Sequence, residues 1–130
     1  MLNQTGIKKT SAVSTNQILF ATTPQMSVGV VVANTGITAG ADGKKIIKAG
    51  TPISGDLTAR TTPFTKETTS TGTSNATAIL LHDVDVTSGN ANATALVFGF
   101  VDLNKLDTAT AALITSEVKT ALKGNVTFIK

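Results

Sequence analysis

Side chains that could take part in catalysis are scarce in this chain of 130 residues. It has one histidine, His82, and no cysteine, so a Ser–His–Asp arrangement would need that histidine and a thiol nucleophile is excluded. In an extended strand Leu81 and Asp83 lie on the face opposite His82, so closeness in sequence does not create a catalytic pair. A lone histidine at the end of an apolar strand more often has a structural role. We therefore expect a protein that is not an enzyme.

Two groups of oxygen-bearing residues invite comparison with cation sites. Asp83 and Asp85 alternate along one predicted strand, and Asp102, Asn104 and Asp107 follow the next one. Calcium takes about six to eight oxygens, and neither group has the spaced acidic loop with a bidentate glutamate that supplies them in an EF-hand. The second group is more typical of a turn followed by a helix cap. Since no glycine spacing matches a nucleotide-binding loop either, we expect no metal and no cofactor.

Charge is sparse and scattered along the chain. Charged residues make up 15% of it, against about 25% in typical domains, and the formal net charge is +3. Nucleic-acid-binding surfaces cluster their lysines and arginines and interleave aromatic residues for stacking. Here the lysines are dispersed, and the aromatic residues are five phenylalanines without tryptophan or tyrosine. We predict no nucleic-acid partner and, without an apolar run of about 20 residues, no membrane partner.

Residues 1–15 have no sustained hydrophobic period, which is typical of an arm that is flexible until it binds something. A short edge strand packed on the domain is the alternative. The apolar residues and the paired lysines of this segment are Leu2, Ile7, Val13, Lys8 and Lys9. A polar stretch follows the lysines, where a signal peptide would have an apolar core, so we expect folding in a cytoplasm.

Residues 16–130 predict one β-rich domain with frequent turns. Residues 27–33 are dense in β-branched side chains and apolar on both faces, which predicts a central or interfacial strand. Short strands are expected at 45–48 and 51–53, with turns at 34–36, 41–43 and 49–50. Residues 56–75 read as a long polar loop in which Pro63 bars a central strand and Phe64 reaches the core.

Two apolar strands, residues 76–86 and 93–102, are expected to pair antiparallel because only about six residues separate them. In each strand, alternation places three side chains on one face: His82, Val84 and Val86 in the first, and Leu96, Phe98 and Phe100 in the second. Gly99 leaves room for close approach of a neighbouring backbone or ring. The candidates for packing in the core or at an interface are Leu80, His82, Val84, Leu96, Phe98 and Phe100.

The C-terminal region predicts one helix and a final strand. Asp107 or Thr108 can cap a helix whose apolar face is formed by Ala111, Ile114, Val118, Ala121 and Leu122. Gly124 provides a stop, and residues 126–130 form a strand. The expected fold class is mainly β with one C-terminal helix (α+β).

The block ATAILLHDVDVTSGNANATALVFGFVDLNKL, residues 76–106, resembles the core of the phage head decoration proteins related to that of phage lambda. GADGKKIIKAGTPI, residues 40–53, is similar to the segment upstream of that core, and residues 107–130 resemble the family's C-terminal end. LLHDVDV is the most specific part of the likeness.

This resemblance implies a small β-barrel or β-tulip-like domain that stabilises the expanded head against the pressure of packaged DNA. It implies a homotrimer bound to the major capsid protein lattice at three-fold and quasi-three-fold positions, on the outer surface of the virion. By the same analogy residues 1–15 are the capsid-docking arm.

Two other classes remain open. A head-fibre or surface β-module would bind a receptor or carbohydrate, usually through tryptophan or tyrosine platforms, and the chain has neither residue. A hydrolase with an unfamiliar pair of carboxylates would have few other groups to use.

Overall fold

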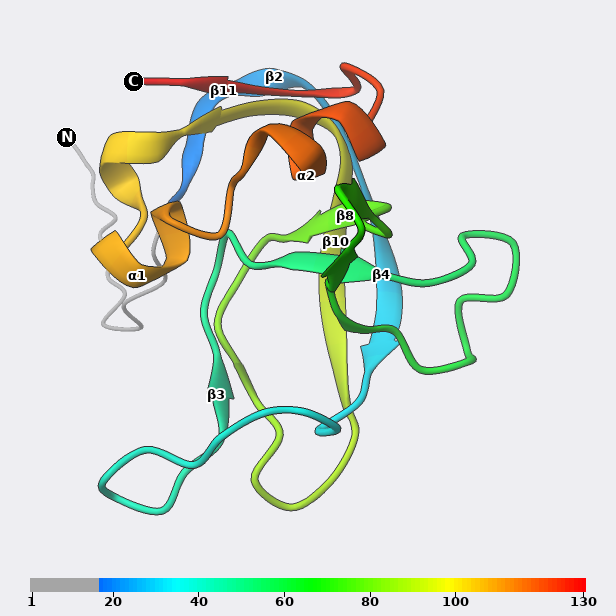
Figure 1. Ribbon diagram of the computed structural model, residues 1–130, viewed down its shortest axis with the longest axis vertical. Coiled ribbons are helices and arrows are strands. Elements are labelled where there is room, and N and C mark those ends of the chain that lie inside the picture. Colours follow the sequence, from blue (N-terminus) through cyan, green and yellow to red (C-terminus); the bar gives the residue numbers. More distant parts are fainter. Residues whose placement is uncertain (1–16) are drawn as a thin grey trace, which may run out of the picture.

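A long antiparallel ribbon, formed by β2 (Leu19–Val32) and β10 (Ala91–Asp102), organises the chain in the computed structural model (Figure 1). The structure describes residues 17–130, apart from the side chains of residues 22 and 23. Both strands are rich in β-branched and apolar residues, which favour an extended backbone. Over the described residues the protein is mainly β and antiparallel, with two short α-helices.

The shorter strands attach to this ribbon or pair with one another. In the larger sheet the order is β11–β10–β8–β4–β5, with β2 also on β10, and only β11 runs parallel to its neighbour. β3 pairs with β9, and β6 with β7. The remaining strands are β3 (Ile46–Ile47), β4 (Pro52–Ser54), β5 (Thr65–Lys66), β6 (Thr69–Ser70), β7 (Thr73–Ser74), β8 (Ala78–Leu80), β9 (Val84–Asp85) and β11 (Val126–Ile129).

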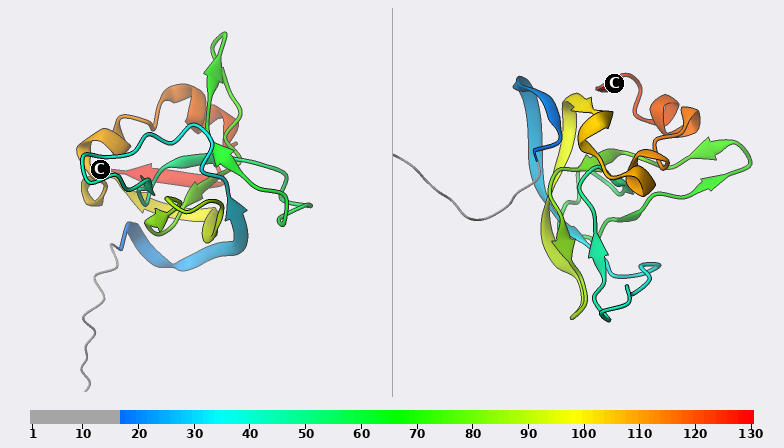
Figure 2. Two further views of the ribbon diagram at one scale, coloured as in Figure 1. Left: turned by 90° about the horizontal axis from the view of Figure 1, so that it is seen from below. Right: turned by 90° about the vertical axis from the view of Figure 1, so that its left-hand side faces the viewer.

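These sheets are open. Within residues 17–130 no sheet closes on itself, so the expected barrel is not found in this part of the chain. Figure 2 shows, in two views, that β2 lies at one side of the described chain and that the helices lie at the opposite side.

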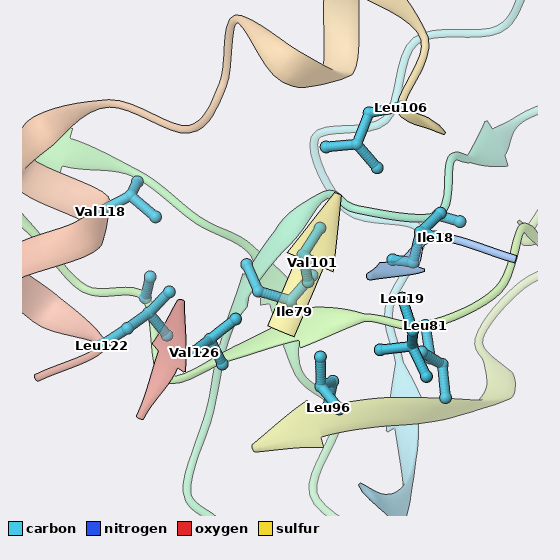
Figure 3. Close-up of a cluster of buried hydrophobic side chains, with 12 residues drawn as sticks. Ile18, Leu19, Ile79, Leu81, Leu96, Val101, Leu106, Val118, Leu122 and Val126 are labelled. Atoms are coloured by element: carbon cyan, nitrogen blue, oxygen red, sulfur yellow. The ribbon is translucent and has the colours of Figure 1, made fainter. Parts of the chain in front are cut away.

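The core has two clusters that share the central strands. Ile79 of β8 and Leu96 of β10 belong to the cluster under the helices, which Figure 3 shows in close-up. Their chain neighbours Leu80 and Ala95 belong to the second cluster, on the other side. β8 and the middle of β10 are therefore buried on both faces, as their nearly continuous apolar sequence predicts.

The region 76–86 is not one strand, contrary to expectation. β8 pairs antiparallel with β10, as predicted, but the chain bends after Leu81 and β9 pairs with β3 instead. The Asp83 carboxylate accepts a hydrogen bond from the Ala49 backbone N–H at 2.7 Å, which ties the bend to the neighbouring segment. Val84 and Val86 are still buried, but His82 is exposed and does not share their environment.

β10 does not keep a regular alternation either. Its register against β2 shifts between Leu96 and Phe98 and again between Phe98 and Phe100. Leu96 is buried, Phe98 is exposed and Phe100 is half-buried, so the predicted common face is wrong. Gly99 has φ +156°, and a Cβ there would lie 3.2 Å from Leu96 Cδ1. The predicted close approach exists, but from a side chain rather than from a backbone or ring.

Residues 56–75 are more ordered than a plain loop. Phe64 is fully buried, as predicted, and a Cβ on Gly55 would overlap its ring. β5 pairs with β4, and β6 and β7 form a small hairpin that the sequence did not reveal. The aromatic ring therefore anchors this polar segment to the core.

The C-terminal helix is interrupted. In place of one helix there are the 3₁₀ turn η1 (Leu103–Lys105), α1 (Thr108–Ala111) and α2 (Ser116–Ala121). Thr115 is extended, with φ −87° and ψ 171°, and its side chain accepts a bond from the Val118 N–H, which begins a second helix. The predicted inward residues still pack on the helix-side core: Ala111, Ile114, Val118, Ala121 and Leu122.

We expect Thr115→Ala to lower the free energy of unfolding by about 1 kcal/mol, because the variant loses the side-chain cap of α2. Thr120→Ala removes an exposed threonine inside the same helix and serves as the control. This control should be neutral or slightly stabilising, since alanine has the higher helix propensity. Urea denaturation followed by circular dichroism measures both, and equal losses would contradict the cap.

Candidate interaction surface

Large apolar side chains are exposed on the β2–β10 ribbon. Among the described residues, four large hydrophobic side chains are exposed, and three of them belong to this ribbon. They are Phe20 at 54%, Met26 at 59% and Phe98 at 43%, and we call these three the ribbon patch. The fourth, Leu57 at 39%, lies in the loop after β4. Apolar groups gathered on neighbouring strands are typical of a surface that another chain covers.

The register of the ribbon places these side chains near one another. Met26 and Phe98 are direct partners, so their side chains lie on the same face of the pair. The next partners along the ribbon are Ala21 and Phe100, and Phe20 adjoins Ala21. From Met26 to Ala21 β2 advances five residues, whereas from Phe98 to Phe100 β10 advances only two. The extra residues of β2, which include Pro24, form an irregular stretch beside Phe98.

The ribbon is almost free of charge. β2 contains no Asp, Glu, Lys or Arg, and in β10 only the last residue, Asp102, is charged. Strands at the edge of a sheet usually carry charges or proline, which prevent pairing with other chains. β2 has only Pro24 for this purpose. An uncharged edge of this length is better suited to contact than to solvent.

The outer edge of β2 is only partly covered by the described residues. At its end, Val31 accepts a hydrogen bond from Phe64 N–H at 2.7 Å and donates to the Arg60 carbonyl at 3.3 Å. Arg60 Nη1 also donates to the Gly29 carbonyl at 2.9 Å. Between residues 20 and 28 no strand of the described chain pairs with this edge. Residues 27–32 therefore belong to a strand at the edge of the sheet, and the central position expected for residues 27–33 is wrong. The other expectation, that this strand contacts another subunit or protein, remains a prediction.

The candidate packing residues divide into two groups. Leu80, Val84 and Leu96 are buried core side chains, whereas Phe98 and His82 are exposed and Phe100 is half-buried. The candidate arm residues lie outside the described residues: Leu2, Ile7, Lys8, Lys9 and Val13. The sequence interpretation missed Phe20 and Met26, because it began the strand at residue 27. The signal that marks them is the absence of any charged residue from 10 to 41.

Three of the acidic side chains that were compared with cation ligands accept hydrogen bonds from nearby backbone N–H or hydroxyl groups. Asp85 accepts from Thr87 N–H at 2.9 Å, and hydrogen bonds from Thr87 hold the pKa of Asp85 below its ordinary value. Asp102 accepts from Asn104 N–H at 2.9 Å and caps η1, as the turn interpretation predicted. Asp107 accepts from Thr110 Oγ1 at 3.0 Å. In the described part of the chain no three His, Cys, Asp or Glu side chains gather as a metal site would require.

Three surface clefts in the described part of the chain have no aromatic walls. Those beside α1, beside the Arg60 end of β2 and beside α2 are lined by aliphatic and polar residues, with no ring against which a sugar could stack. No helix in residues 17–130 has the length and apolarity needed to span a membrane.

His82→Ala should leave the free energy of unfolding within about 0.5 kcal/mol of the parent value, because the side chain is exposed at the bend after β8. Binding to the partner proposed below should also be unchanged. Thermal denaturation and a binding assay test both expectations. A loss of binding with intact stability would give the histidine a direct role.

Comparison with known proteins identifies no family for this chain: no family model matches it, and no curated protein matches it.

Proposed function

We propose that the protein is a capsid decoration protein, with a small β-tulip-like domain, on the outer surface of a tailed-phage head. It binds as a homotrimer to the major capsid protein lattice, at three-fold and quasi-three-fold positions of the expanded shell. There it stabilises the head against the pressure of packaged DNA. The observation that carries the proposal is the uncharged β2–β10 ribbon with its exposed Phe20, Met26 and Phe98. The resemblance of residues 76–106 to decoration proteins is the reason for proposing this class of binding protein rather than another.

The physical requirements of such a role agree with what this chain offers. Clamping a shell needs a rigid body and several weak contacts that act together, because linked contacts raise the apparent affinity without any new chemistry. β8 and the middle of β10 are buried on both faces, which gives the domain a well-packed centre. The role needs no reactive group, cofactor, nucleic acid or membrane.

In this proposal residues 1–15 form the docking arm. Strand addition obtains its affinity from backbone hydrogen bonds, so a plain sequence of Thr, Ser and Ala suffices. The described chain begins at Gln17, close to Phe20 on the ribbon. A trimer would therefore present three arms to one site on the shell.

Co-sedimentation with empty expanded heads that lack their decoration protein tests this function. We expect the full chain to pellet with expanded heads and to stay in solution with unexpanded ones. Free protein without heads is the control for aggregation. Glycan binding without binding to any head would favour the receptor-binding module instead.

A further inference from the structure

We infer that the part of the ribbon around Met26 and Phe98 is the contact between copies of this chain. The inference rests on the proposed decoration function, in which the protein assembles as a trimer, and it names the surface that does so. The two side chains are register partners on adjacent strands and are 59% and 43% exposed. Side by side, they form a continuous apolar spot, which Phe20 extends along the same ribbon.

The distribution of charge favours a second copy as the occupant. Every copy carries the same net charge of +3, so a contact that included the lysine-bearing parts would bring like charges together. The ribbon avoids this cost, because β2 has no charged residue and β10 has only Asp102 at its end. Side chains that lie on a three-fold axis meet their equivalents from the other copies, so an uncharged patch placed on the axis brings no like charges together there; away from the axis the contact joins two different surfaces of each copy.

The position of the ribbon agrees with this arrangement. β2 lies at the side of the described chain away from α1 and α2 (Figure 2), and its edge from residue 20 to 28 has no partner strand among the described residues. A neighbouring copy can therefore approach without displacing any described element. Since Gln17 precedes Phe20 by only a few positions, contact here also brings the Gln17 residues of the copies towards one another.

Leu57 provides a matched comparison. It is also an exposed large apolar side chain, at 39%, but it stands between Asp56 and Arg60 in a turn. Asp56 is exposed, and hydrogen bonds from Thr58 hold its pKa below the ordinary value, so a charge persists beside Leu57. A lysine at position 57 should therefore leave self-association unchanged.

The test measures the mass of the full chain and of Met26→Lys, Phe98→Lys and Leu57→Lys by sedimentation velocity over a range of concentrations. We expect the parent and Leu57→Lys to form trimers, and both ribbon variants to associate about 100-fold more weakly or not at all, because each places like charges in the contact. Circular dichroism checks the fold. Met26 is the more exposed of the two ribbon residues, so Met26→Lys decides the question if Phe98→Lys does not fold.

Each outcome bears on a different claim. Trimers that persist in Met26→Lys would overturn the inference. A parent chain that is monomeric at every concentration would also overturn it and would remove the preformed homotrimer from the proposed function; whether the chain decorates heads is then decided by co-sedimentation alone. Dissociation of the ribbon variants, combined with no binding of the parent to expanded heads, would support the inference and overturn the proposed function.

Discussion

Phe64→Ala should lower the free energy of unfolding by about 3–5 kcal/mol, which is a large part of the stability of an ordinary domain. The ring is fully buried in the second core cluster and fills the space that the missing Cβ of Gly55 leaves open. Its backbone N–H donates to Val31 O of β2 at 2.7 Å, and its carbonyl accepts from the N–H of Ala33, the residue after β2, at 2.8 Å. Removal of the ring leaves a cavity at the point where the segment 60–64 covers the edge of β2.

Urea denaturation followed by circular dichroism measures this effect, at a fixed protein concentration because self-association adds to apparent stability. The matched control is Leu57→Ala, an exposed apolar residue of the same region, which should stay within about 0.5 kcal/mol. A loss below about 1 kcal/mol for Phe64→Ala would show that the ring does not anchor the loop.

Deletion of residues 1–15 should remove binding to expanded heads while the remaining chain stays folded. In the part of the chain that the structure describes, the buried residues of both core clusters lie in residues 18–126, and the deletion retains all of them. If three arms act together, their loss should weaken binding about 100-fold or more. Co-sedimentation measures the binding, and a thermal melt of the shortened chain measures the fold.

A point variant separates strand addition from other modes of arm binding. Ile7→Pro removes a backbone N–H and restricts φ, so it should weaken binding strongly if the arm adds to a sheet. Ile7→Ala keeps the N–H and is the control. Unchanged affinity after deletion of residues 1–15 would move the docking surface onto the domain itself.

Features that depend on local chemistry were predictable from the sequence. The turn at 41–43 forms as expected, with a Gly43 N–H to Gly40 O bond of 2.9 Å and a positive φ of 80° at Gly43. The short strands around Ile47 and Ile53 follow from their β-branched residues. Phe64 is buried because it is the one large apolar side chain in a polar part of the segment, and burial removes its ring from water.

Features that depend on partners distant in sequence were not predictable. The helical period from Ala111 to Leu122 correctly selected the inward side chains, but it could not show that Thr115 would cap a new helix. The pairing of β9 with β3 depends on a segment far along the chain. Periodicity alone gave no reason to end β8 near Leu81.

Of the ribbon patch, Phe98 was identified from the sequence but Phe20 and Met26 were not, because their neighbours in space are distant in sequence. Phe98 was a candidate for subunit contact, but regular alternation placed it beside Leu96 on a buried face. The register shifts on either side of it have different origins: between Leu96 and Phe98 the extra residue is in β10, whereas between Phe98 and Phe100 the extra residues are in β2. Met26 becomes a candidate contact residue only when the register shows that it pairs with Phe98.

Cryo-electron microscopy of empty expanded heads incubated with the full chain tests the decoration function most directly. We predict added density for three copies at each three-fold and quasi-three-fold position on the outside of the shell. Heads that stay bare at saturating protein, or density confined to other positions, would contradict the account.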